Sequence, residues 1–114
     1  MARFVAGDVL VVPFPYSDMS GAKLRPALVL AAWPNHMTAD YLVCLISSQS
    51  KAYALSLALA AKDFIRGGLP LPVSYIRPWY LIAVDEQAIV RRAGRVQPAL
   101  LGLVLDAVVA RLKL

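Results

Sequence analysis

Arg25 is the residue of this chain whose position best suits phosphate chemistry. It stands where a polar stretch gives way to a very apolar one, and Pro26 follows it directly. A proline forces the preceding residue towards an extended backbone, so the guanidinium would leave the chain in a fixed direction. A planar cation with five N–H donors matches the oxygens of a phosphate group. On the pattern alone, an ordinary surface arginine is the more frequent explanation.

A second group of polar side chains follows the apolar segment 41–46. It runs Ser47, Ser48, Gln49, Ser50. Hydroxyl and amide groups of this kind donate to phosphate oxygens and to the exposed edges of bases. A plain transition from strand to loop has the same composition, so the pattern by itself leaves both interpretations open.

Several familiar catalytic arrangements need residues that this chain lacks. No Gly-rich phosphate loop of Walker or Rossmann spacing is present. With His36 as the only histidine and Cys44 as the only cysteine, neither a structural zinc site nor a pair of catalytic histidines is available. We interpret His36 as a solvated loop residue and Cys44 as part of the core. Phosphodiester chemistry would use other groups, and no metal or cofactor is expected.

The composition favours a small basic protein that associates with a partner. The chain has 114 residues, 60% hydrophobic and 17% charged, with a formal net charge of +5. We expect one domain spanning residues 1–114. A domain of this size cannot cover so much apolar surface alone, which predicts a partner, most simply a second copy. The basic surplus favours a nucleic acid. Without an apolar run of about 20 residues or a signal peptide, a cytoplasmic location and no membrane contact are expected.

Short strands make up most of the elements that would position Arg25 and Ser47. Strands are predicted over residues 8–13, 27–32, 41–46, 55–59, 73–76, 80–84 and 89–96, with one helical turn over 61–64. The loop 17–21 is rich in turn residues. Many short strands closed by one helix indicate a mainly β chain folded as a small, strongly bent barrel.

The last segment of the chain changes to a helical period. Apolar residues spaced by three and four begin shortly after Pro98, and they are Leu101, Val104, Leu105, Val108 and Leu112. The opposite face is also apolar, with few charges. A helix that is apolar on most sides is covered on most sides. It is therefore a candidate for a contact between two subunits, although a helix lying across its own barrel would show the same pattern.

Taken together, the motifs resemble the PemK/MazF toxin family of type II toxin–antitoxin systems. The order and spacing of the segments carry the resemblance, because no single motif is decisive. They are residues 7–15 (GDVLVVPFP), 20–21 (SG), 25–29 (RPALV), 46–49 (ISSQ), 68–70 (GLP) and 74–77 (SYIR). The last two resemble the PemK-like branch, and the match covers roughly residues 7–112.

The resemblance implies a fold, an activity and partners. The fold would be an SH3-like β-barrel of the PemK/MazF/CcdB type with a C-terminal helix, assembled as a homodimer. The activity would be metal-independent, sequence-selective cleavage of single-stranded RNA, often messenger RNA. A small cognate antitoxin would neutralise the protein by binding across the dimer.

The resemblance also implies roles for individual residues. The family's catalytic arginine and its catalytic threonine or serine fall on Arg25 and Ser47. Arg25 would offset the charge that builds on the phosphate as a ribose 2′-OH attacks it, since a guanidinium is a poor base. Ser47 would orient the phosphate or the 2′-OH. The residues expected to hold RNA are Gln49, Ser48, Ser20, Lys23 and Arg77.

Some features depart from the family pattern or leave alternatives open. Ser47 replaces the commoner threonine and loses the methyl that stiffens the side chain. The loop 16–24 is shorter than in many MazF proteins, which leaves substrate preference open. Arg77, Trp79 and Tyr80 form a basic–aromatic cluster that suits base stacking as well as an ordinary barrel edge. The alternatives to RNA cleavage are a CcdB-like toxin that acts by binding gyrase and a non-catalytic RNA-binding barrel.

Overall fold

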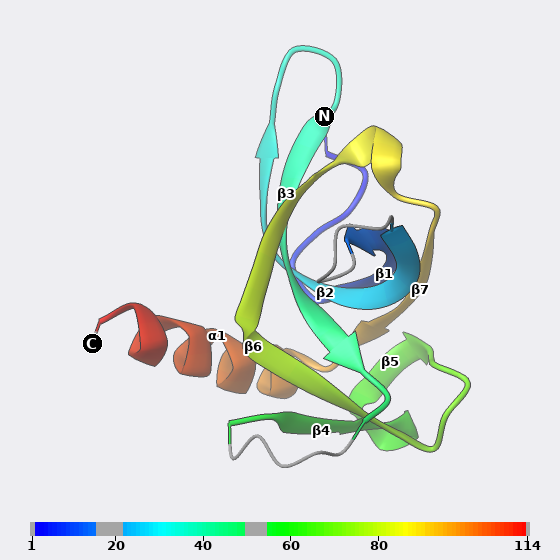
Figure 1. Cartoon of the computed structure of the whole chain (residues 1–114), viewed down its shortest axis with the longest axis vertical. Coiled ribbons are helices and arrows are strands. Elements are labelled where there is room, and N and C mark those ends of the chain that lie inside the picture. The colour runs from blue at the N-terminus through cyan, green and yellow to red at the C-terminus, as the bar shows by residue number, and fades with distance from the viewer. Residues whose placement is uncertain (1, 16–21, 50–54, 114) are drawn as a thin grey trace.

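A strongly bent β-sheet and one C-terminal helix form the fold in the computed structural model, which describes residues 2–15, 22–49 and 55–113. Figure 1 shows the sheet curling round on itself, with the helix lying to one side. The elements are β1 (Asp8–Pro15), β2 (Ala22–Pro34), β3 (Ala39–Ser47), β4 (Leu57–Ala60), the 3₁₀ turn η1 (Ala61–Asp63), β5 (Phe64–Gly67), β6 (Val73–Asp85), the 3₁₀ turn η2 (Glu86–Ala88), β7 (Arg91–Val96) and α1 (Pro98–Leu112). No helix in these ranges has the length and hydropathy that crossing a bilayer demands.

The strands form an antiparallel, nearly closed barrel. Among the described residues, seven strands follow the order β4-β6-β3-β2-β1-β7-β5. The pairing register shifts between Val29 and Ala31 of β2 and between Cys44 and Ile46 of β3. Such bulges bend strands and increase their twist, which lets a small sheet close. The predicted mainly β barrel with a C-terminal helix is confirmed.

The long central strands bury both of their faces, which explains their continuous apolar sequences. On β1, Leu10 and Val12 belong to one buried cluster, inside the barrel, while Val9 belongs to a second. The second cluster includes Val104 and Val108 of α1, so it fills the space between the sheet and the helix. Two-sided burial removes the alternation of polar and apolar residues that marks a half-exposed strand.

Pro78 lies within one strand, although the sequence predicted two strands separated there. The pairing between β3 and β6 runs through Ile76 and resumes at Leu81, so the residues between them lie in an irregular stretch of the ladder. A proline is tolerated at such a place because its missing N–H is not needed. The predicted break at residues 77–79 was therefore wrong.

The strand β5 was not predicted from the sequence. The predicted helical turn over 61–64 is the shorter turn η1, and β5 begins at Phe64. Gly67 ends β5 with a φ of +64°, and a Cβ there would lie 2.2 Å from the carbonyl oxygen of Ala93. Glycine is thus required by the close approach of two backbones. The residues of β5 are mostly exposed and show no periodicity, so the sequence carries little signal for this strand.

The helix α1 matches the predicted segment, but its buried stripe differs. Leu100, Val104 and Val108 are buried, and the predicted Leu101 and Leu105 are only half-buried. Leu112 is 72% exposed, contrary to the prediction, because the end of the helix extends beyond the sheet (Figure 1). The outer face also exposes Leu103.

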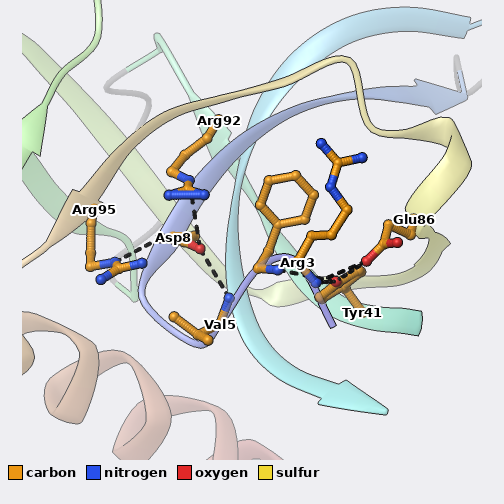
Figure 2. Close-up of polar contacts among 8 residues, drawn as sticks. Arg3, Val5, Asp8, Tyr41, Glu86, Arg92 and Arg95 are labelled. Carbon is orange, nitrogen blue, oxygen red and sulfur yellow. Dashed lines mark hydrogen bonds and ion pairs between the residues drawn. The ribbon is translucent and has the colours of Figure 1, made fainter. Parts of the chain in front are cut away.

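A polar cluster ties the N-terminal residues to the barrel. The hydroxyl of buried Tyr41 donates to Oε1 of Glu86 at 2.5 Å. The backbone N–H of Arg3 donates to both groups, and that of Phe4 donates to the Tyr41 oxygen, as Figure 2 shows around Arg3, Tyr41 and Glu86. The hydrogen bond from Tyr41, followed by that from Arg3, lowers the pKa of Glu86 below its ordinary value of 4.5. Burial, followed by the bond to Glu86, raises the pKa of Tyr41.

We predict that Glu86→Gln destabilises the fold in a pH-dependent way. A lowered carboxyl pKa in the folded state stabilises the protein above the ordinary pKa, and this contribution is lost as the pH falls through the folded value. The free energies of unfolding of parent and variant, from urea titrations, should differ at pH 7 and converge at a pH well below 4.5. Asp106→Asn, at an exposed helix position, is the control and should change little at either pH. If the free energies of unfolding of parent and Glu86→Gln differ by the same amount at both pH values, the charge of Glu86 does not stabilise the fold.

Candidate functional site

Arg25 and Ser47 lie on neighbouring strands at the same end of the barrel. In β2, Arg25 pairs with Val12 of β1, and the ladder between β2 and β3 reaches Ala27 opposite Leu45. Continuing that register by two residues sets Arg25 opposite Ser47. Residues opposite one another in an antiparallel pair share a face of the sheet. Both side chains therefore lie on the face that carries Ala27 and Leu45.

Ser47 is held in place at the end of β3. It is buried, with 6% of its surface exposed. Its Oγ accepts the backbone N–H of Gln49 at 3.1 Å, which fixes the side chain against the turn that ends the strand. The hydroxyl hydrogen stays available to donate to a ligand. Ser48 and Gln49 follow as exposed residues.

Tyr75 lies beside Ser47, and sequence reasoning missed it as a site residue. The register pairs Ser47 of β3 with Tyr75 of β6, which places the half-buried tyrosine on the face shared by Ser47 and Arg25. The sequence signals at Tyr75 were its place in the family motif 74–77 and its spacing of two residues from Arg77, which puts both on one face of a strand. Because β6 is far from β3 along the chain, these signals could not show which strand it faces.

The other predicted RNA-binding residues with a described position lie on β2, on β6 and directly after β3. Lys23 is exposed and pairs with Phe14, so it stands two residues before Arg25 on the same face. Arg77 is half-buried on β6. Ser20 lies outside the described residues. The ring of Tyr80 packs edge-on against Phe14, with centroids 5.6 Å apart, which favours the barrel-edge interpretation for this member of the aromatic cluster.

A small pocket opens next to Arg25 on the opposite face of the sheet. Its lining includes Arg25, Ser48 and Ser74, with apolar walls from β3 and from the segment 69–71. Ser47 is not part of the lining. Arg25 thus stands at the boundary between the face of Ser47 and this pocket.

The Gly7-Asp8 motif has a structural role away from this site. Asp8 is fully buried, and its carboxylate accepts the N–H of Val5 at 2.9 Å and Nε of Arg95 at 2.8 Å. Nε of Arg92 lies 3.8 Å away, and Figure 2 shows Asp8 between the two guanidinium groups. Gly7 precedes it with a φ of +98°. Within the described ranges, no three His, Cys, Asp or Glu side chains lie close enough to hold a metal ion.

Two solved structures that resemble this chain share its fold. One is an endoribonuclease in complex with its cognate antitoxin from a mycobacterial species, with a TM-score of 0.71, 18% identity, and coverage of 98% of this chain and 97% of that chain. Another is MazE–MazF from Deinococcus radiodurans, with a TM-score of 0.70, 17% identity, and coverage of 97% of both chains. The chain matches none of the curated proteins with which it was compared.

A family profile identifies the chain at the level of sequence. The profile described as PemK-like, MazF-like toxin of type II toxin–antitoxin system matches residues 6–112. This range contains the Gly7-Asp8 motif, the Arg25-Pro26 strand and Ser47, and it ends with α1. The chain therefore belongs to the PemK-like, MazF-like toxin family of type II toxin–antitoxin systems.

Proposed function

We propose that this toxin is a metal-independent, sequence-selective endoribonuclease that cleaves single-stranded RNA, in particular messenger RNA. The observation that carries the proposal is the placement of Arg25 and Ser47 on adjacent strands and on one face of the sheet. Membership of the family supports it. A cation and a hydroxyl on one face of the sheet, the hydroxyl held by Gln49, suit a phosphate with developing negative charge.

The reaction is an attack of a ribose 2′-OH on the adjacent 3′ phosphate. The new bond joins the 2′ oxygen to phosphorus, and the bond from phosphorus to the 5′ oxygen breaks. The 2′-OH loses its proton and the departing 5′ oxygen gains one, so the products are a 2′,3′-cyclic phosphate and a 5′-OH. Arg25 offsets the charge on the phosphate oxygens through charge-assisted hydrogen bonds. Ser47 donates its hydroxyl hydrogen to the same group and orients it.

The surrounding polar residues would hold the strand on either side of the scissile phosphate. Lys23 is exposed on the same face as Arg25, and Arg77 lies on β6 two residues beyond Tyr75. Both supply charge for neighbouring phosphates. Ser48 and Gln49 would bond to base edges or phosphates at the end of β3. Ser20 joins this set on the family resemblance alone.

Two protein partners complete the proposal: a second copy of the chain and a cognate antitoxin. The two similar structures contain antitoxins, which supports neutralisation by such a protein here. The exposed apolar face of α1, with Leu103 and Val109, suits a contact between subunits. The cytoplasm, where messenger RNA is translated, is the expected location.

If this function is right, RNA cleavage depends on Arg25 and Ser47, which is the first prediction of the proposal. Pure protein is incubated with a mixed single-stranded RNA in EDTA, and cleavage rates are measured for the parent, Arg25→Ala and Ser47→Ala. Each substitution removes a donor to the charged transition state and should slow cleavage by about 10²–10³-fold. Arg111→Ala, at an exposed position of α1, is the control. Intact RNA with the parent across a broad set of sequences would refute the enzyme.

The second prediction concerns the ends that cleavage leaves. Internal attack gives a 5′-OH on the downstream fragment, so polynucleotide kinase should label it without prior phosphatase treatment. A substrate with a 2′-deoxy nucleotide at the scissile position should bind and stay intact, because it lacks the nucleophile. Fragments that carry a 5′ phosphate would instead indicate attack by water.

The third prediction is that Leu103→Asp disrupts the homodimer. Sedimentation should give a dimer for the parent and a monomer for the variant, since a charge on the contact face would lose its water without a partner. Met37→Asp is the matched control, because Met37 is 86% exposed in the loop between β2 and β3. A dimer that survives Leu103→Asp would place the subunit contact elsewhere.

A further inference from the structure

The pocket beside Arg25 has the size of a site for one small ring system. Its volume is about 180 Å³. Pockets that enclose drug-sized molecules begin at about 300 Å³, so this pocket suits a ligand group no larger than a heterocyclic base. Apolar side chains form most of its wall, contributed by Ile46 of β3 and by Leu69, Pro70 and Leu71 ahead of β6. Walls of this kind pack against the flat face of a ring.

Two hydroxyl groups give the pocket a polar side. Ser74 of β6 is 4% exposed and lines the pocket. Among the described residues, none forms a hydrogen bond with its hydroxyl. Because Ser74 lines the pocket, this hydroxyl is available to bond with a group that enters it. Ser48, which is exposed, adds a second hydroxyl.

The chemistry of the lining selects a nucleobase among possible occupants. A hydroxyl both donates and accepts, which matches the alternating donors and acceptors on the edge of a base. Arg25 also lines the pocket, so a base inside it would lie next to a cation that suits the phosphate of the same strand. An apolar side chain of a partner protein would fill the walls but leave the Ser74 hydroxyl without a bond.

We propose that this pocket binds one base of the RNA strand, next to the phosphate held by Arg25, and that Ser74 reads the edge of that base. The inference rests on the proposed RNA cleavage and deepens it, because it assigns part of the sequence selectivity to the sheet face opposite Ser47. Pro70 and the flanking leucines supply the stacking surface. Ser74 is a specificity residue here and touches no reacting atom.

The test measures binding of an RNA oligonucleotide that cannot be cut. The oligonucleotide carries a fluorescent label and a 2′-deoxy nucleotide at the cleavage position, and fluorescence anisotropy gives its Kd. An abasic site is then moved along the strand, one position at a time. One position should weaken binding by about five- to a hundredfold, which is the usual loss for a base that stacks on a protein surface. At that position, the four natural bases are compared next.

Variants of Ser74 then decide the role of the pocket. Ser74→Ala removes the hydroxyl and should bring the Kd values for the four bases close together. Ser74→Val also fills part of the pocket, so the base should no longer enter it and an abasic site should no longer weaken binding. Ser56→Ala, at a half-buried serine outside the pocket lining, should behave as the parent does. Thermal unfolding of each variant shows that the fold is retained.

The outcomes separate failure of the base site from failure of the enzyme. An oligonucleotide that binds with no sensitive position, or with a sensitive position that Ser74→Val leaves unchanged, overturns the base site while RNA cleavage stands. A flat abasic scan is also the result if a partner's apolar side chain occupies the pocket. A parent protein that neither binds nor cuts any RNA removes the proposed function and the base site with it.

Discussion

The buried charge of Asp8 is the interaction on which the pairing of the first strand with the last depends. A carboxylate with no exposed surface is tolerable only when hydrogen bonds and opposite charges compensate it, and Val5, Arg92 and Arg95 supply both. These contacts join β1 to β7, its neighbour in the sheet and the last strand before the helix. The strand β1 also pairs with β2. Val12, four residues after Asp8 on β1, lies opposite Arg25, so the contacts that hold Asp8 also help to hold Arg25 in position.

How far the sequence could predict the site depends on how local each contact is. Arg25 and Ser47 lie on consecutive strands, so their proximity follows from the family motifs and from simple strand order. Tyr75 reaches the same place only through the pairing of β3 with β6, across a register shift in β3 that no propensity encodes. The pocket at Ser74 was missed for the same reason, since its walls come from three separate segments of the chain.

The elements that sequence reasoning missed are those whose local signals mislead. A proline such as Pro78 usually interrupts a strand, but here it lies where the pairing between β3 and β6 is already irregular. The strand β5 has no apolar alternation, and its end at Gly67 is set by contact with Ala93 rather than by propensity. Leu112 keeps the helical spacing but lies past the edge of the sheet. In each case, contacts with other parts of the fold determined the secondary structure or the burial, and the local sequence did not.

The high apolar content is explained by two cores in place of one. The sheet buries residues on its inner face and again beneath α1, so a small chain needs apolar residues on both sides of β2 and β3. Some of the apolar side chains that stay exposed, such as Leu103 and Val109, lie on the outer face of α1. Large apolar side chains nevertheless stay exposed on several elements, among them Trp33, Ile65 and Leu103, so the expectation of a partner from composition stays a prediction.

The burial of Cys44 bears on how such a toxin is controlled. Burial raises the pKa of this thiol to about 12, and the chain has no other cysteine. At neutral pH, thiolate is present in on the order of one molecule in 10⁵, and thiolate is the form that oxidants and electrophiles attack. Burial in the folded protein therefore protects the Cys44 thiol from such reagents. Control through this cysteine would require the core to open first.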